Sequence, residues 1–167
     1  MIWFSLFVFS VLCYVIWAAI HELSHVYMAH KLIGITYWEI NLIPKLPQEA
    51  NSFRIQFASC FYTPGKLPTK KQQAAISIAP RIPDILGAIA LPFTCYTSEP
   101  FSYFLMIFFG SALIDLFVGS LGMSKKSDLR KASNKLGLSP WWLRIFGFLT
   151  ILCSIGHLLK NTGWIIK

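Results

Sequence analysis

The stretch His21-Glu22-Leu23-Ser24-His25 carries the residues whose types and spacing point most directly to chemistry. Two histidines four positions apart project from one face of an α-helix, one turn from each other. Two imidazoles at that spacing can bind one zinc ion, and the intervening glutamate can accept a proton from a water molecule on the metal. The pattern therefore predicts a zinc site with His21 and His25 as ligands and Glu22 as general base.

The surroundings of this pattern are strongly apolar. Residues 8–20 before it and residues 26–29 after it carry no charged side chain. A side chain that can bind a metal is costly inside a membrane helix, and such residues usually have a function. The setting therefore favours a metal site over a chance match to three fixed positions.

A hydrolytic zinc site usually has three protein ligands, so a third ligand must come from another part of the chain. His30 lies nine positions after His21, which places it on the opposite side of the same helix. His157 lies in the last apolar segment, where a lone histidine is more simply explained as a packed, hydrogen-bonded side chain. The carboxylates are therefore the better candidates.

Among the carboxylates, Asp115 is the one whose position most needs an explanation. It lies in the apolar residues 112–118, which contain no basic residue, and an ionised carboxylate there is disfavoured unless a cation balances it. A divalent metal would be such a cation. Asp128 is the alternative, although a solvated ion pair with the lysines and arginines around it would also account for it. Asp84 ranks third, because Arg81 three positions before it can pair with it on a helix.

The composition is that of a membrane protein. The chain has 167 residues, of which 55% are hydrophobic and 13% charged, against about 25% charged in soluble domains. The net charge of +8 does not indicate nucleic acid, because the basic residues cluster between apolar stretches, as in loops that face anionic lipid. Four cysteines without a Cys-x-x-Cys pair indicate neither a disulfide framework nor a thiolate zinc site.

The apolar segments predict an all-α membrane bundle of about four transmembrane helices, with a small β-hairpin insertion after the first helix and a single domain over residues 1–167. The expected spans are residues 2–31, 74–96, 101–122 and 141–159. The second span is expected to be kinked, because proline interrupts helices. Its prolines are Pro80, Pro83 and Pro92.

The segment at 35–64 differs from the spans and predicts the hairpin. Residues 35–43 are rich in β-branched and aromatic side chains, and residues 53–58 alternate apolar and polar side chains. Pro64 and Gly65 mark a turn after the second strand.

Positive charge predicts the orientation of the bundle. Six of the fifteen basic residues lie in residues 31–74 and five in residues 123–140, a segment expected to be a loop. The positive-inside rule places both segments in the cytoplasm and both termini outside. The paired histidines then lie toward the cytoplasmic end of the first span.

Taken together, these features resemble the site-2 protease family of intramembrane zinc metallopeptidases. The resemblance rests on the paired histidines and glutamate in a membrane helix, and on the strand-rich segment, the proline-interrupted span and the intramembrane carboxylate that follow. It covers about residues 5–130 and is most specific at residues 21–25. It implies one zinc ion held by two histidines and one aspartate, Glu22 as the base, and hydrolysis of peptide bonds in membrane-embedded protein substrates.

Two later elements of that family are present only in part. The family's second element resembles Ala-Gly-Pro-x-x-Asn, and residues 78–84, which read Ile-Ala-Pro-Arg-Ile-Pro-Asp, come near it. Its third element carries Asn-x-x-Pro and then Leu-Asp-Gly, and the chain has neither in full. Asp115 can stand for the family's aspartate, or Asp115 can take the asparagine's place and Asp128 the aspartate's. The third ligand therefore stays open between these two residues.

A non-catalytic membrane protein is the competing interpretation. Such a protein would bind a metal or act as an accessory subunit, with the histidine pattern arising by chance or decay. The incomplete later elements favour this interpretation. Metal analysis separates the two in part, since a three-ligand site predicts about one zinc ion per chain.

Overall fold

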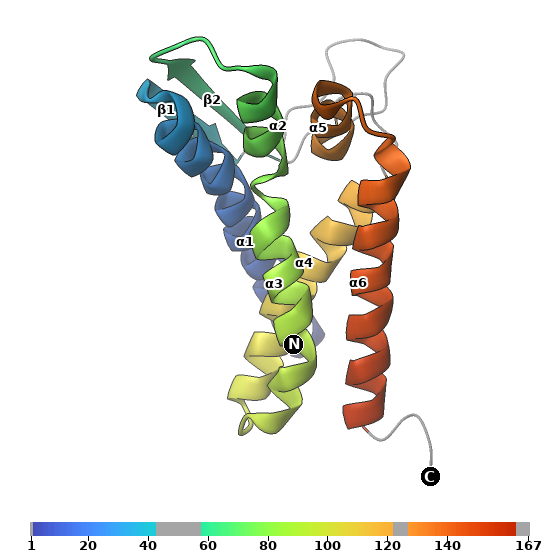
Figure 1. The fold of residues 1–167 in the computed structure, drawn as a ribbon. Helices are drawn as coiled ribbons and strands as arrows, with labels where there is room; N and C mark the ends of the chain where they lie inside the picture. Colours follow the sequence, from blue (N-terminus) through green and yellow to red (C-terminus); the bar gives the residue numbers. More distant parts are fainter. Residues whose placement is uncertain (1, 43–57, 122–126, 163–167) are drawn as a thin grey trace, which may run out of the picture.

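The computed structural model describes residues 2–42, 58–121 and 127–162 of the chain. Within those residues, four helical segments are long and apolar enough to cross a membrane. The first, third and fourth segments are the single helices α1 (Ile2–Ile33), α4 (Phe101–Leu121) and α6 (Pro140–Asn161). The second segment consists of α2 (Lys70–Ile78), α3 (Arg81–Ala90) and the 3₁₀ helix η1 (Leu91–Tyr96). A two-stranded hairpin follows the first helix (Figure 1). The predicted helical bundle with a hairpin insertion is therefore confirmed.

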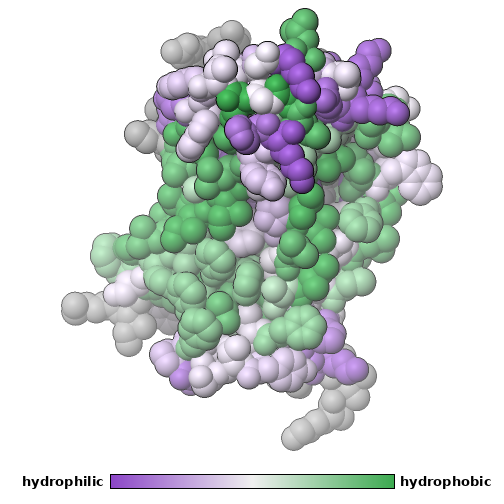
Figure 2. Space-filling model, turned by 60° about the vertical axis from the view of Figure 1, so that its left-hand side comes forward, coloured by the Kyte–Doolittle hydropathy of each residue, from purple (hydrophilic) through white to green (hydrophobic). Residues whose placement is uncertain are grey.

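On the face drawn in Figure 2, an apolar belt lies between two more polar ends of the bundle. Large apolar side chains from several helices, among them Trp3, Phe7, Leu86 and Leu152, are more than half exposed. Such a surface is unfavourable in water, but it matches the hydrocarbon interior of a bilayer. This is the architecture of a multi-span membrane protein.

Helix α1 is longer than a bilayer requires. No glycine or proline interrupts residues 2–33, and the 32 helical residues correspond to about 48 Å, against a hydrocarbon core of about 30 Å. The helix ends where Gly34 adopts a φ of +63° and donates its N–H to the carbonyl of His30. The paired histidines lie in the last third of the helix, near the hairpin.

Strand β1 (Ile35–Asn41) pairs antiparallel with β2 (Ser59–Pro64). The first strand was predicted at residues 35–43 and is confirmed. The second was predicted at residues 53–58, and residues 53–57 of that prediction lie outside the described part of the chain. The observed second strand, β2, begins directly after the predicted range and ends at Pro64, where the turn was predicted. Its register pairs Ile35 with Pro64 next to the end of α1 and Ile40 with Cys60 near the opposite end of the strands.

The second membrane segment is interrupted where its prolines predict. Helix α2 ends at Ile78 and α3 begins at Arg81, with Pro80 between them, and Pro92 lies in the 3₁₀ helix that follows α3. Pro83 causes no break because it lies in the first turn of α3, where its missing N–H has no partner within the helix. The expected kinks at Pro80 and Pro92 are confirmed.

Helix α5 (Asp128–Leu136) is an element that the sequence did not predict, since residues 123–140 were expected to form a loop. Its apolar face, with Leu129 and Ala132, is buried, and the helix packs against α2 (Figure 1). Gly137 ends it with a φ of +68°. The consequence for the site is that Asp128 begins a helix docked beside the histidines.

Small residues bring the membrane helices close together. A Cβ added at Gly87 of α3 would lie 2.5 Å from Cβ of Ala112 on α4, and one added at Gly147 of α6 would lie 2.1 Å from Oγ of Ser120. Close backbone approach through small residues is the usual way in which helices associate in lipid. These close contacts hold α3, α4 and α6 together as a unit, and this unit supports the site residues.

Candidate metal centre

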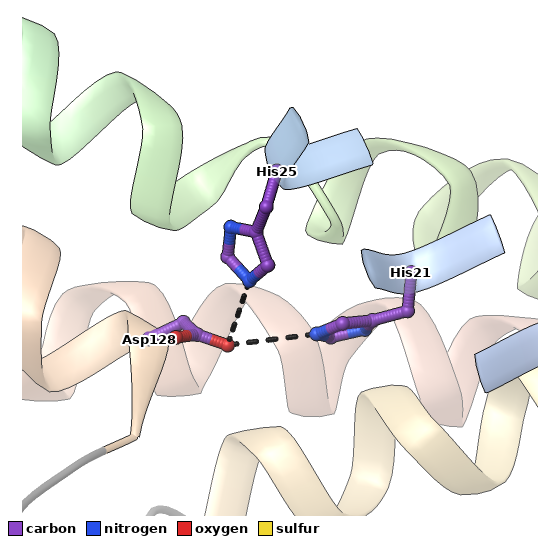
Figure 3. Close-up of side chains that lie close together, drawn as sticks. All are labelled: His21, His25 and Asp128. Carbon is purple, nitrogen blue, oxygen red and sulfur yellow. Dashed lines mark ion pairs between the residues drawn. The ribbon is translucent and has the colours of Figure 1, made fainter. Parts of the chain in front are cut away.

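Two imidazoles of α1 and one carboxylate of α5 converge on a single point (Figure 3). Oδ2 of Asp128 lies 3.5 Å from Nε2 of His21 and 3.5 Å from Nε2 of His25. One ligand atom from each of the three residues lies within 4.8 Å of the others. The ligand atoms of a tetrahedral zinc ion, bonded at about 2.1 Å, lie about 3.4 Å apart. The three side chains therefore have nearly the spacing that such an ion requires.

The other ring nitrogen of His25 is held by the backbone of α2. Its Nδ1 lies 2.7 Å from the carbonyl oxygen of Ile76. In an uninterrupted α-helix that carbonyl would accept the N–H four residues later, but the residue there is Pro80, which has no N–H. The break in the second segment thus leaves a carbonyl free to accept Nδ1–H of His25, and the lone pair of Nε2 then faces Asp128.

The other ring nitrogen of His21 faces a different carboxylate. Its Nδ1 lies 2.6 Å from Oδ2 of Asp115 on α4, although this oxygen lies off the direction of an Nδ1–H bond. Oδ2 of Asp84 is 3.7 Å from the same nitrogen. Asp115 and Asp128 therefore lie on opposite sides of the His21 ring. Both aspartates singled out from the sequence reach the site, and each faces a different nitrogen.

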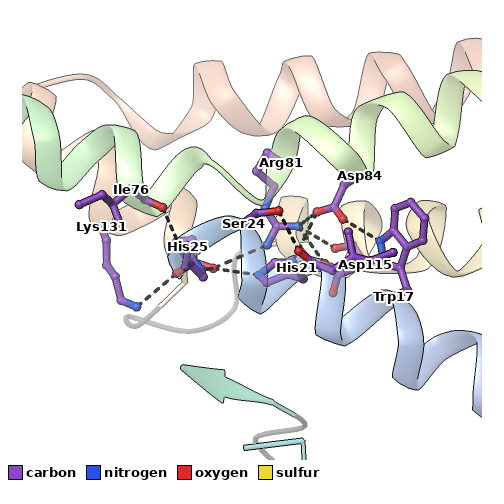
Figure 4. Close-up of polar contacts among 11 residues, drawn as sticks. Trp17, His21, Ser24, His25, Ile76, Arg81, Asp84, Asp115 and Lys131 are labelled. Carbon is purple, nitrogen blue, oxygen red and sulfur yellow. Dashed lines mark hydrogen bonds and ion pairs between the residues drawn. The ribbon is translucent and has the colours of Figure 1, made fainter. Parts of the chain in front are cut away.

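Arg81 supplies the cation for Asp84 and Asp115 (Figure 4). Its Nη1 lies 2.7 Å from Oδ2 of Asp84 and donates to the backbone carbonyl of Asp115, with Oδ2 of Asp115 at 3.5 Å. The predicted pairing of Arg81 with Asp84 is confirmed. Asp84 is fully buried and also accepts a hydrogen bond from Nε1 of Trp17. His21, Asp84 and Asp115 form a second group with metal-like spacing, but the guanidinium already lies against both of its carboxylates.

The charged groups of this cluster carry a net negative charge that a divalent cation would balance. Asp84, Asp115 and Asp128 contribute three negative charges when ionised, and Arg81 contributes one positive charge. With both histidines neutral, as metal ligation requires, these four groups carry a net charge of −2. Lys131 contacts Oδ1 of Asp128 at 3.2 Å, but its side chain is half exposed and solvent screens the pair. One divalent cation would balance the net charge of these four groups.

Asp128 is ionised at neutral pH. Burial by itself would raise the pKa of this carboxyl, but its contacts with His21 and His25, and then the charges of His25 and Lys131, hold the pKa well below the usual range. An ionised carboxylate is the form that ligates metals. Its position at the start of α5 further favours negative charge, because the helix N-terminus is the positive end of the helix dipole.

Glu22 faces the hairpin. Its side chain is 8% exposed, and it forms a hydrogen bond with the thiol of Cys60 on β2. Burial, together with the charge of Glu22, raises the pKa of Cys60 to about 12, so the thiol stays protonated and can donate to the carboxylate. Sequence reasoning missed this contact, since Cys60 carries no motif and its approach depends on the register of the hairpin.

The two histidines that were set aside lie apart from this cluster. His157 of α6 stacks near Phe93, with ring centroids 5.7 Å apart, and His30 lines an apolar groove with Trp38. Neither belongs to a metal-like group among the residues that the structure describes.

Comparison of the chain with protein-family models, with curated proteins and with solved structures finds no match. The chemistry of the site must therefore be inferred from its geometry alone.

Proposed function

We propose that this chain is an intramembrane zinc metalloendopeptidase, similar in its chemistry to the site-2 proteases. The observation that carries the proposal is the convergence of His21, His25 and Asp128, with Oδ2 of Asp128 3.5 Å from Nε2 of each histidine and Nδ1 of His25 held by the Ile76 carbonyl. In this proposal Asp128 is the third ligand. Asp115 instead orients His21 through Nδ1, because it does not face the nitrogen that points to the other two ligands.

The donor set fits zinc. Two imidazole nitrogens and one carboxylate oxygen are a usual ligand set for hydrolytic zinc, and they leave a fourth position open for water or substrate. Each proposed ligand is oriented by a further contact: His25 by the Ile76 carbonyl, His21 by Asp115 and Asp128 by Lys131. Such supporting contacts typically strengthen metal binding by 10- to 100-fold.

Glu22 is the general base of the proposed reaction. A zinc ion bound by the three ligands would lower the pKa of a water molecule toward neutrality and polarise a carbonyl group. Glu22 would accept a proton from the attacking water and pass it to the amine that leaves when the peptide C–N bond breaks. Cys60 can donate to one carboxylate oxygen of Glu22 and leave the other free for this transfer.

The proposed substrate is a membrane-embedded or membrane-associated protein segment. An apolar groove of about 360 Å³ lies between α1 and the second segment, lined by residues that include Leu23, directly after Glu22, and Ile82, directly after Arg81. An apolar substrate segment fits this surface. The positive-inside rule supports a site on the cytoplasmic side, because the lysines of α2 and α5 lie at the same end as the hairpin.

The test uses the full chain purified in detergent micelles. We expect about one zinc ion per chain by elemental mass spectrometry, and cleavage of fluorescein-labelled casein and of a single-span reporter protein. Glu22→Gln should keep the zinc and abolish cleavage, because it removes the base and leaves the ligands intact. Ser24→Ala is the matched control: its hydroxyl donates to the carbonyl of Ile20 within α1, and we expect full activity.

Two outcomes would contradict the proposal. Cleavage that persists in the Glu22→Gln variant would show that another group is the base, or that a contaminating protease is responsible. A wild-type chain that binds zinc but cuts neither substrate would favour the non-catalytic metal-binding interpretation.

A further inference from the structure

The geometry points to Arg81 as a second catalytic residue. We propose that its Nη2 donates a hydrogen bond to the carbonyl oxygen of the scissile peptide as negative charge develops on that oxygen. This inference rests on the function proposed above and adds the group that stabilises the transition state. In this role Arg81 acts as a fixed hydrogen-bond donor.

Within the described residues, every hydrogen bond donated by the Arg81 side chain comes from Nη1. Nη1 contacts Oδ2 of Asp84 at 2.7 Å, the carbonyl of Asp115 at 3.1 Å and Oδ2 of Asp115 at 3.5 Å. Among the described residues, Nε has no hydrogen-bond partner and Nη2 has only an ion pair at 3.9 Å. Arg81 is 8% exposed, and a buried guanidinium with unused donors is costly unless another group accepts from it.

The unused donors lie beside the proposed zinc ligands. The partner of Nη2 at 3.9 Å is Oδ2 of Asp128, the oxygen that faces both histidines. In a tetrahedral site the oxygen at the open vertex lies about 3.4 Å from each ligand atom. An oxygen at that distance from Oδ2 of Asp128 can lie within about 2.9 Å of Nη2 with the guanidinium where it stands. The 3.9 Å separation of Nη2 and Oδ2 of Asp128 thus leaves room for a carbonyl oxygen that contacts Nη2 beside the proposed zinc site.

The guanidinium is rigidly held, as electrostatic stabilisation of a transition state requires. Asp84 and Asp115 fix Nη1 from α3 and α4. Gly119 of α4 packs against its face: an added Cβ would lie 2.5 Å from Nη1, 2.6 Å from Cζ and 2.8 Å from Nη2. A counter-charge alone would not need this close fit, since a lysine ammonium would neutralise the carboxylates as well.

Arg81→Lys tests the role of the fixed donor while keeping the charge. Removing one such donor typically lowers kcat by about 10²- to 10³-fold. We expect that loss on labelled casein, with unchanged zinc content and a KM within about threefold of the wild-type value. The second readout is independent of turnover: the cobalt-substituted protein is titrated with methylphosphonate, a tetrahedral anion, and with neutral imidazole, by visible absorbance. The variant should bind methylphosphonate at least about tenfold more weakly and imidazole equally well.

Gly119→Ala tests the same inference with every charge in place. Its new methyl group would overlap the guanidinium and shift it, so we expect weaker methylphosphonate binding and lower kcat with zinc retained. Gly110→Ala is the matched control on the same helix, because nothing lies within 4 Å of its added Cβ. That control should behave as the wild type.

Each outcome supports or overturns the role of Arg81. If either Arg81→Lys or Gly119→Ala has the same kcat and the same affinity for methylphosphonate as the wild type, the proposed role of Arg81 is wrong. Loss of zinc in both variants, or equal weakening of both probes, would show that Arg81 only holds the cluster together and would overturn it too. If the wild type holds metal but does not cleave, the proposed function fails while the titrations still decide whether Arg81 binds an anion at the metal. A wild type without metal contradicts both proposals.

Discussion

At the scale of single residues, Asp115 and Asp128 differ in the nitrogen of His21 that each one faces. Asp128 faces Nε2, together with His25, whereas Asp115 faces Nδ1 from the opposite side. A residue on the Nε2 side can share a metal with both histidines. A residue on the Nδ1 side can orient the ring and increase its basicity. The two carboxylates therefore have different proposed roles although both contact one imidazole.

This division predicts two different losses of zinc affinity. Asp128→Ala should lose stoichiometric zinc, because a two-histidine site lacks the third ligand. Asp115→Asn keeps the shape of the side chain, and it should bind zinc about 10- to 100-fold more weakly than the wild type, as expected for a supporting contact. Competition with a fluorescent zinc chelator measures both affinities. The reverse order, with Asp115→Asn the more severe, would make Asp115 the ligand.

The sequence could predict the ligand types but not this division. The spacing of His21 and His25 follows from helical periodicity, and it correctly places both rings on one face. Asp115 was ranked first because its apolar segment offers no cation, yet Arg81 of α3 lies 3.5 Å from it. Contacts between α3 and α4 decide that pairing, and no local pattern in the sequence encodes them.

At the scale of elements, the break between α2 and α3 has a consequence for the metal site. Pro80 provides no N–H, so the carbonyl of Ile76 is available to Nδ1 of His25. The proline thus does more than bend the segment: it supplies the acceptor that orients a proposed ligand. Sequence reasoning predicted the kink but had no means of predicting which carbonyl would become available to a histidine of another helix.

Pro80→Ala should therefore weaken zinc binding. Alanine restores an N–H that can compete for the Ile76 carbonyl, and it favours a continuous helix through this point. We expect a loss of zinc affinity of about 10- to 100-fold, the range for a lost supporting contact. Pro83→Ala is the control, since Pro83 lies in the first turn of α3 and its replacement adds no N–H that competes for the Ile76 carbonyl. Equal zinc affinity in the two variants would contradict this role of Pro80.

Helix α5 shows what sequence patterns miss at this scale. Its nine residues include four that are charged, and so short a helix is marginal in isolation. Burial of Leu129 and Ala132 against the bundle stabilises it instead. The long apolar helices were predictable because their length and composition suffice, whereas α5 exists only through tertiary contacts. Since Asp128 begins α5, the third ligand could not be assigned before the fold was known.

At the scale of the whole molecule, helices α1, α3, α4 and α5 bring together a cluster in which carboxylates outnumber the buried guanidinium. Asp84, Asp115, Asp128 and Arg81 sum to −2 with neutral histidines, and uncompensated charge is expensive in a low-dielectric interior. Zinc bound at the proposed site would therefore link metal binding to folding. At a free zinc concentration 1,000 times Kd the linkage adds about 4 kcal/mol to stability. For a chain of this size that corresponds to roughly 10 °C in Tm.

Removing zinc with a chelator should accordingly lower the Tm of the wild type by several degrees, measured by circular dichroism in detergent micelles. Asp128→Asn removes one of the unbalanced charges as well as the ligand. Its Tm should not respond to the chelator, and it should lie above that of the metal-free wild type, because less repulsion remains in the cluster. If the metal-free wild type is instead as stable as the zinc-loaded protein, the buried charges are balanced by protons and not by a metal.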